Sequence, residues 1–466
     1  MPRHPRRRQA IPAVAVGVAL LLGSCASPRY TRPEVPVPPS YRGDAAPPPA
    51  AKSAESRSLG ELRWQELVHD EELSKLIQEA LAHNFDVQMA AARVLEARAQ
   101  LTMARAALFP LVDAQVGYSN LRSVGLDTSS TSLSPSLGWE LDLWGKIRNA
   151  SMAARADLLA SEQARRVVLQ TLVSDVANAY FLLRDLDLEL EITRQALQLR
   201  EDSLDLVKLR VENGYSSEIE LAQAEVLVKG ARTSLTGLEL QIEQTENQLA
   251  ILLGRNPGPI VRGRSLAEQE MAPSLPPGLP STLLDRRPDI REAEEQLIAD
   301  HYLVAAAKAA FFPTISLTAS AGFASSALLE LLKASSGTWF FGPAASLPVF
   351  NAGAIRAGVR SAEARRQQSL LVYQKTVQQA FGEVADSLAA YRKLAELRAQ
   401  QKDLVESLRK GVELADLAYK GGVVSYLEYL DSERQLLDEQ LLLVQVRRQE
   451  LTNIVTLYRA LGGGWQ

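Results

Sequence analysis

The chain carries the same series of motifs twice, about 200 residues apart. Residues 104–110 return as residues 307–313, and both segments end in Phe-Pro. Four further residues of the first copy have counterparts in the second: Leu141 corresponds to Leu347, Trp144 to Phe350, Gly214 to Gly422 and Ser217 to Ser425. This spacing is far above the roughly 20–50 residues of solenoid repeats. The sequence therefore predicts a duplicated unit of domain size, with an internal two-fold repeat.

The distribution of proline predicts long helices in both copies. Residues 136–256 and 349–466 contain no proline, which costs about 3 kcal/mol inside a helix. Apolar residues recur there at spacings of three and four, as in coiled coils: Leu169, Leu172, Val176, Ala179 and Leu183, then Val405, Leu408, Val412, Ala415 and Tyr419. We predict a mainly α protein of long antiparallel helical hairpins, with tips at about 213–218 and 420–426.

Four shorter segments alternate apolar and polar residues, as strands with one buried face do. They form one predicted β-hairpin per copy, at about 111–143 and 314–348. Each segment is long enough for a tilted membrane strand of about 10 residues. The fourth is the least regular, because Trp339 and Phe341 share a face that Phe340 opposes. A soluble sheet with one wet face would give similar alternation.

Four strands are too few for a closed membrane barrel, which needs about eight or more. Open sheet edges are not tolerated in lipid. Membrane strands in this chain therefore require an oligomer. Two copies would supply about 8 strands and a filled interior, whereas three would supply about 12 and room for a channel. The polar strand face and the long helices favour three.

The N-terminus has the pattern of a lipoprotein signal. Residues 1–24 combine arginines with a short apolar run that cannot span a membrane as a helix. They precede Cys25, the only cysteine, in a lipobox that predicts cleavage and acylation of its thiol, as with palmitate. An ordinary signal peptide with an incidental cysteine is the alternative. No Asp follows Cys25, which favours the outer membrane, and residues 25–58 are predicted to form a proline-rich, lipidated tether with little packing.

Composition and motif content argue against several classes of function. The net charge of −4 and the pI near 5.8 argue against a nucleic-acid-binding protein. The four histidines, His4, His69, His83 and His301, show no metal spacing, and there is no glycine-rich phosphate loop. We therefore expect no enzymatic activity and no cofactor or metal, with any transport driven by a partner.

Several motifs resemble those of one family. Residues 285–290, Asp-Arg-Arg-Pro-Asp-Ile, followed by Glu294 and by residues 309–313, resemble the signature of TolC-like outer-membrane efflux proteins. The lipobox places the chain near the lipoprotein (NodT-type) branch that serves resistance-nodulation-division (RND) pumps. The resemblance covers residues 60–461.

The resemblance implies a homotrimer whose 12-stranded β-barrel in the outer membrane continues into a periplasmic α-helical barrel. Such a channel passively conducts drugs or other small molecules from an inner-membrane RND pump and a periplasmic adaptor to the outside. In this frame, residues 59–285 form the first structural repeat and residues 286–466 the second.

The resemblance also implies a periplasmic gate at the second tip. Glu428 and Asp431 stand three apart, so they share one helix face. Repeated threefold they would form a ring of carboxylates that attracts cations, although a solvated helix face is the alternative. Val424 occupies the place of the family's gating arginine, so closure is expected to rest on Tyr419, Tyr426 and acidic repulsion.

The tip residues have a second implied role. Gly214, Ser217, Gly421, Gly422 and Ser425 would meet the hairpin tips of the adaptor. The alternative is that they only form two tight turns, since glycine readily adopts positive φ.

Two other functions remain open at this point. One is a structural coiled-coil periplasmic lipoprotein scaffold whose β-hairpins never enter the membrane. The other is the outlet duct of a protein (type I) secretion system. The strand pattern and the family signature favour the efflux channel.

Overall fold

The computed structural model describes residues 29–40, 59–123, 125–270 and 280–465. The predicted signal peptide, Cys25 and most of the tether lie outside the described residues. The elements, in chain order, are η1 (Leu59–Glu61), α2 (Trp64–Leu67), α3 (Glu71–His83), α4 (Phe85–Ala106), β1 (Leu111–Ser123), β2 (Leu126–Leu141), α5 (Lys146–Glu212), α6 (Glu218–Leu252), η2 (Leu266–Glu268), α7 (Pro280–Arg286), α8 (Pro288–Ala309), β3 (Thr314–Ser325), η3 (Leu328–Glu330), η4 (Ala334–Ser336), β4 (Gly337–Ser346), α9 (Ala354–Lys420) and α10 (Tyr426–Ala460).

The lengths of the helices confirm the internal repeat. Helices α4 and α8 have 22 residues each, α5 and α9 have 67, and α6 and α10 have 35. A helix of 67 residues is about 100 Å long at 1.5 Å per residue. The fold is therefore mainly helical, with long helices in the predicted places. Within the described ranges, none of the helices is apolar enough over a sufficient length to cross a membrane.

The described chain divides into two compact units that cut across the sequence repeat. One contains residues 29–35, 92–162 and 292–375, and the other contains residues 36–40, 59–91, 163–270 with 280–291, and 376–465. Each unit thus takes segments from both copies. The predicted division at 285–286 separates the copies in sequence but does not separate compact units, because equivalent elements of the two copies pack together.

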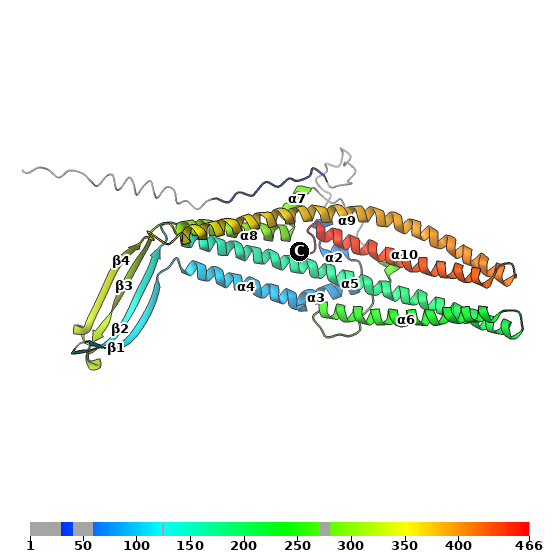
Figure 1. Ribbon diagram of the computed structural model, residues 1–466, viewed down its shortest axis with the longest axis horizontal. Helices are drawn as coiled ribbons and strands as arrows, with labels where there is room; N and C mark the ends of the chain where they lie inside the picture. Colours follow the sequence, from blue (N-terminus) through cyan, green and yellow to red (C-terminus); the bar gives the residue numbers. More distant parts are fainter. Residues whose placement is uncertain (1–28, 41–58, 124, 271–279, 466) are drawn as a thin grey trace, which may run out of the picture. The chain divides into compact units, whose positions relative to one another are not determined.

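The first unit contains an antiparallel four-stranded sheet in the order β1-β2-β3-β4 (Figure 1). Its register aligns the apolar positions: Val112 lies opposite Leu137, which lies opposite Ala319, which lies opposite Phe341. The neighbouring row contains Asp113, Ser136, Ser320 and Phe340. One face is therefore apolar and the other mostly polar, with Phe340 as the exception that the sequence indicates.

The apolar face of the sheet is open to its surroundings in the single chain. Val116 in β1 is 77% exposed and Trp339 in β4 is 82% exposed. Strands β1 and β4 also form the two edges of the sheet, where one side of each backbone has no partner strand among the described residues. Both features leave the sheet incomplete as a soluble structure.

A short part of the tether packs on the first unit, in contrast to the expectation of little packing. The Arg32 guanidinium donates two hydrogen bonds of 2.7 and 2.5 Å to Glu294 in α8. The Tyr30 ring meets His301 edge to face, with ring centroids 5.9 Å apart. A bidentate arginine–carboxylate contact is stronger and more specific in geometry than an ion pair with a single hydrogen bond. Residues 29–35 are therefore anchored to α8.

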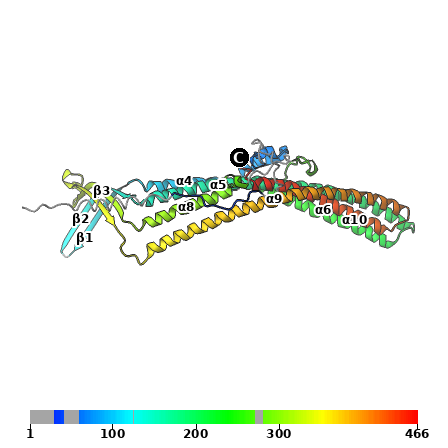
Figure 2. The ribbon, with the colours of Figure 1, turned by 90° about the horizontal axis from the view of Figure 1, so that it is seen from above.

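The second unit contains the two helical hairpins of the chain. Helix α6 runs beside the later part of α5, and α10 beside the later part of α9 (Figure 1, Figure 2). Arg194 bonds Glu239 across the first pair, and Gln401 bonds Glu439 across the second. Most of the predicted coiled-coil positions face the core, since six of the ten are buried and the other four are partly exposed. The buried ones are Leu172, Val176, Ala179, Leu183, Val405 and Tyr419.

The motif at 285–290 has a structural role in this unit. Arg287 is buried and its guanidinium contacts the Asp289 carboxylate at 2.7 Å, the Glu383 carboxylate at 2.8 Å and the Ala460 carbonyl at 3.0 Å. It therefore joins the start of α8 to α9 and to the end of α10. Because arginine has five donors in a planar fork, one side chain can tie three segments together.

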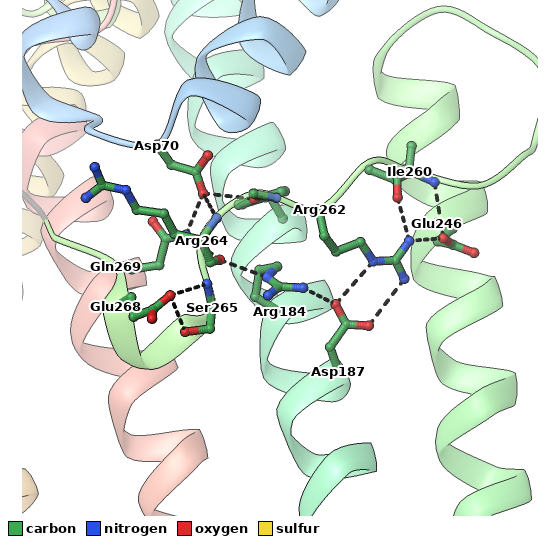
Figure 3. A network of polar contacts seen from close by, with 12 residues as sticks. Asp70, Arg184, Asp187, Glu246, Ile260, Arg262, Arg264, Ser265, Glu268 and Gln269 are labelled. Carbon is green, nitrogen blue, oxygen red and sulfur yellow. Dashed lines mark hydrogen bonds and ion pairs between the residues drawn. The ribbon is translucent and has the colours of Figure 1, made fainter.

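A buried carboxylate organises the segment that follows α6 (Figure 3). Asp70 is 2% exposed and caps the N-terminus of α3. It accepts hydrogen bonds from the amides of Glu72, Leu73 and Arg264, from the Tyr180 hydroxyl and from the Gln269 amide. Burial would raise the pKa of Asp70, but the hydrogen bonds from Gln269, Tyr180 and the helix amides outweigh it and lower the pKa.

A second part of this network fixes the same segment to the long helices. Arg262 contacts both Asp187 in α5 and Glu246 in α6, and Arg184 donates to the Arg264 carbonyl at 2.9 Å (Figure 3). Residues 260–269 are therefore held by charge-assisted contacts on α5 and α6 as well as by Asp70.

We predict that Asp70→Ala lowers the free energy of unfolding by about 3 kcal/mol, because several buried donors lose their acceptor. The control Glu268→Ala, in an exposed capping box of the same segment, should cost less than about 1 kcal/mol. Urea unfolding followed by tryptophan fluorescence measures both. Since the folded-state pKa of Asp70 is lowered, its contribution is present above the unfolded pKa and lost as the pH falls through the folded pKa. Equal losses in the two variants would contradict this account.

Candidate gate at the helical tips

The two hairpin tips are built by the same turn chemistry. Gly214 and Gly422 follow α5 and α9 with φ of 75° and 76°, a conformation that glycine adopts without a steric penalty. Ser217 and Ser425 then cap α6 and α10, each accepting a hydrogen bond of 3.3 Å from the amide three residues on. Gly421 comes directly before Gly422 at the second tip and is exposed. These residues thus form the predicted turns, and contact with an adaptor stays a prediction.

Three tyrosines form a cluster at the second tip. The Tyr419 ring lies 5.1 Å from that of Tyr426 and stacks on that of Tyr429 at 6.0 Å, measured between centroids. Tyr419 and Tyr426 are only 6% and 2% exposed. The predicted closing residues are therefore buried side by side in the interior of the tip.

The tyrosine cluster joins the two hairpins of the chain. The Arg210 guanidinium, from α5, lies 4.9 Å above the Tyr419 ring. The Ser203 hydroxyl, also from α5, is 3.1 Å from the Tyr426 hydroxyl. Apolar residues from both hairpins complete this contact: Leu204, Val207, Ala224, Val228 and Leu430 are buried, and Val424 packs against them. Val424 thus supplies apolar contact at the position where the resemblance implies an arginine in the family.

A buried carboxyl group lies beside the cluster. The Tyr429 hydroxyl donates a hydrogen bond to one oxygen of Glu433, and the other oxygen is buried with no hydrogen-bond partner in the described part of the chain. Burial raises the pKa of the Glu433 carboxyl even though the bond from Tyr429 opposes this shift. The hydrogen bond fixes the orientation of Tyr429 within the cluster.

The two predicted gate carboxylates are exposed on the first turns of α10. The Glu428 side chain accepts from the Ser425 amide at 3.4 Å and completes a capping box. Asp431 accepts from Arg434 at 2.8 Å and Gln435 at 2.6 Å, and these hydrogen bonds lower its pKa. Asp431 is therefore ionised at neutral pH and is paired with the positive charge of Arg434.

A groove separates the first turns of α6 and α10. It has a volume of about 550 Å³, and its walls are mostly apolar, with three charged residues, Glu218, Asp431 and Arg434, along its lining. Ile219 and Leu427 line this groove and are 69% and 61% exposed. Both hairpins therefore present apolar side chains beside the charged residues of the tip.

A further polar contact between the hairpins was not predicted from the sequence. Asp185 in α5 is 2% exposed and accepts from Arg448 in α10 at 2.8 Å. One turn on, Glu189 accepts from Gln445 at 2.9 Å. Burial raises the pKa of Asp185 to about 6; the charge of Arg448 lowers it and that of Glu189 raises it. The sequence feature that could reveal this contact is the charged residue Asp185 among closely spaced leucines.

Comparisons with known proteins agree on one kind of protein. A family model described as "Outer membrane efflux protein" matches residues 76–255 and 279–463. The chain is 37% identical over 459 residues to "Probable efflux pump outer membrane protein TtgC" of Pseudomonas putida, which covers 96% of this chain and 94% of that protein. It is 36% identical over 455 residues to "Cation efflux system protein CusC" of Escherichia coli, covering 96% and 98%. The solved open state of the Neisseria gonorrhoeae MtrE outer membrane channel matches with a TM-score of 0.86 at 31% identity, covering 95% of this chain and 99% of that one.

We predict that Arg210→Ala loosens the contact between the hairpins. A cation–π contact at a partly exposed site contributes about 1 kcal/mol, so amide hydrogens of residues 419–430 should exchange about 5-fold faster. Lys208→Ala is the matched control, since Lys208 forms an exposed ion pair with Asp205 on the same helix. Equal exchange in both variants would show that Arg210 does not hold the tip.

We predict that Asp185→Asn raises the free energy of unfolding at pH 7 by about 2 kcal/mol, because the raised pKa means that burial of the Asp185 charge costs more than its pairing with Arg448 returns. Since the folded-state pKa is above the unfolded value of about 3.9, the unmodified site contributes stability that rises as the pH falls from about 6 to 4. The variant should lose this pH dependence in urea unfolding, whereas Asp202→Asn, an exposed change on the same helix, should retain it. A less stable Asp185→Asn protein at pH 7 would mean that the ion pair with Arg448 outweighs the burial.

Proposed function

This chain belongs to the outer membrane efflux protein family, and from that premise we propose that it forms the outer-membrane duct of a tripartite export system. Drugs or other small molecules would pass passively through it from an inner-membrane RND pump and a periplasmic adaptor to the outside. The family is one of transport channels, and the fold is the TolC-like fold that the sequence predicts. The observation that supports the proposal best is the four-stranded sheet with an exposed apolar face.

The open edges of this sheet support a homotrimer. Backbone N–H and C=O groups on the outer sides of β1 and β4 have no strand partner among the described residues. Each such group would cost several kcal/mol if it faced lipid. Three copies supply about 12 strands, which close a barrel wide enough for a channel. The acyl chain on Cys25 would add a lipid anchor at the outer membrane.

The tips support a gate made of two parts. Glu428 and Asp431 are exposed and repeat three times in a trimer, so they would attract cations at a constriction. Tyr419 and Tyr426 act differently, because both are buried between the hairpins of one chain. They would oppose opening by holding α5 and α9 together, with Arg210 as the third member of the contact.

The adaptor would meet the turn residues Gly214, Ser217, Gly421, Gly422 and Ser425. The apolar groove beside Ile219 and Leu427 extends the surface that such a partner could cover. One of the two relatives is described as a cation efflux protein and the other is not, although their identities to this chain are 36% and 37%. We therefore place the selection of substrates in the pump rather than in the duct.

The test is the conductance of the purified, lipidated protein in a planar bilayer, with the oligomer mass measured in the same detergent. We predict a trimer with a small, cation-selective conductance that is closed most of the time. Glu428→Gln with Asp431→Asn should shift the reversal potential in a salt gradient toward zero, because the carboxylates at the constriction are removed. Asp202→Asn with Glu243→Gln, a charge-matched control at exposed positions on α5 and α6, should leave it unchanged.

Unchanged selectivity in the Glu428 and Asp431 variant would remove the acidic ring from the account. Absence of both conductance and trimer would instead favour the structural scaffold.

A further inference from the structure

One aromatic contact joins the two copies of the repeat at the base of the sheet. Trp144 follows β2 and stacks on Phe312, which precedes β3, with ring centroids 4.9 Å apart and planes inclined by 19°. The Trp144 indole N–H also donates to the Pro313 carbonyl at 2.6 Å. The contact lies where the β-hairpin of the first sequence repeat (β1 and β2) pairs with that of the second repeat (β3 and β4).

The internal repeat supplies a second pair of aromatic residues at equivalent positions, and these two do not contact each other within the described chain. Phe350 follows β4 as Trp144 follows β2, and Phe109 precedes β1 as Phe312 precedes β3. Phe350 is 88% exposed and Phe109 is 69% exposed. Among the described residues, Phe350 and Phe109 thus lack the ring contact that Trp144 and Phe312 make.

The register between β2 and β3 also predicts the register in which β4 would pair with β1 of a second chain. Leu141 lies opposite Ile315, and Trp139 lies opposite Leu317. In the internal repeat, Leu347 and Ala345 correspond to Leu141 and Trp139, and Val112 and Ala114 correspond to Ile315 and Leu317. The equivalent pairs between two chains are therefore Leu347 with Val112 and Ala345 with Ala114. Continued along the strands, this register places Phe341 opposite Tyr118.

The two faces of the sheet agree with this register. Phe341 lies opposite Ala319 on the apolar face, and Tyr118 belongs to the same face as Val116. A slip by one residue would set Phe341 against Gly117 or Ser119 on the polar face, since side chains alternate along a strand. A slip by two would keep the faces but would move Phe350 away from Phe109.

We propose that β4 of one copy pairs antiparallel with β1 of the next copy in the register that sets Phe341 opposite Tyr118, and that Phe350 stacks on Phe109 of that next copy. The proposal rests on the proposed homotrimer and defines the contact that closes it. Each closure then repeats the contact of Trp144 with Phe312, so a ring of three copies contains alternating Trp–Phe and Phe–Phe pairs at the base of the sheet.

The register can be tested with cysteine pairs in the full-length lipidated protein. Ala345→Cys with Ala114→Cys places two thiols opposite each other across neighbouring copies. Ala345→Cys with Val112→Cys and Ala345→Cys with Val116→Cys are controls on the same face, two residues out of register. Mild oxidation should link copies only in the first variant, visible as higher bands in non-reducing electrophoresis.

The outcomes separate this proposal from the proposed function. Linking in either control variant, or in none while the oligomer mass is that of three copies, overturns the register and leaves the trimeric duct in place. A monomer mass overturns both.

The aromatic contact has its own test in the temperature at which the oligomer dissociates in detergent. Phe350→Ala should lower this temperature by several degrees, and Phe109→Ala added to it should lower it no further. Val349→Ala is the control, since Val349 is the neighbouring residue and is 90% exposed. Phe350→Trp should raise the temperature, because an indole N–H could donate to the Pro110 carbonyl as Trp144 donates to that of Pro313. Equal effects of Phe350→Ala and Val349→Ala, or additive effects of the two Phe→Ala changes, would overturn the contact.

Discussion

Backbone hydrogen bonding at the sheet edges is the constraint on which the rest of the structure depends. The strands β1 to β4 satisfy their inner edges within the chain and leave the outer edges of β1 and β4 without a strand partner among the described residues. The exposed apolar face directs the sheet toward lipid, where unpaired backbone groups are most costly. Other copies of the same chain can supply the missing partners. The contact of Trp144 with Phe312 shows in one chain how such neighbours would meet.

The hairpin tips follow a different principle, in which short-range chemistry shapes the ends and long-range contacts hold them together. Positive-φ glycines turn the chain and Ser217 and Ser425 restart the helices. The tyrosine cluster and Arg210 then join hairpins that are about 200 residues apart in sequence. This contact is apolar and aromatic at its centre, with carboxylates such as Asp431 at the surface. Opening of the tip would therefore have to expose buried aromatic rings, so the gate that we propose could stay closed without an arginine at position 424.

The sequence predicts the elements that depend on periodicity, and the structure adds those that depend on distant partners. The repeat, the coiled-coil positions such as Val176 and the alternating strands can be found because each repeats a local rule many times. Asp70, by contrast, has partners in α3, α5 and the segment after α6. Arg32 lies in a proline-rich segment for which the sequence predicts little packing, because its partner Glu294 lies in another part of the chain. Single polar contacts of this kind have no period, so a single sequence does not reveal them.

Amide hydrogen exchange of the lipidated protein in a bilayer tests the central claim most directly. If neighbouring copies complete the sheet, amides on the outer sides of β1 and β4 should be protected about as strongly as those between β2 and β3, because all of them then carry strand hydrogen bonds. Strong protection between β2 and β3 with fast exchange along the outer sides of β1 and β4 would contradict the account. It would mean that the sheet stays open and that this chain does not form a closed duct.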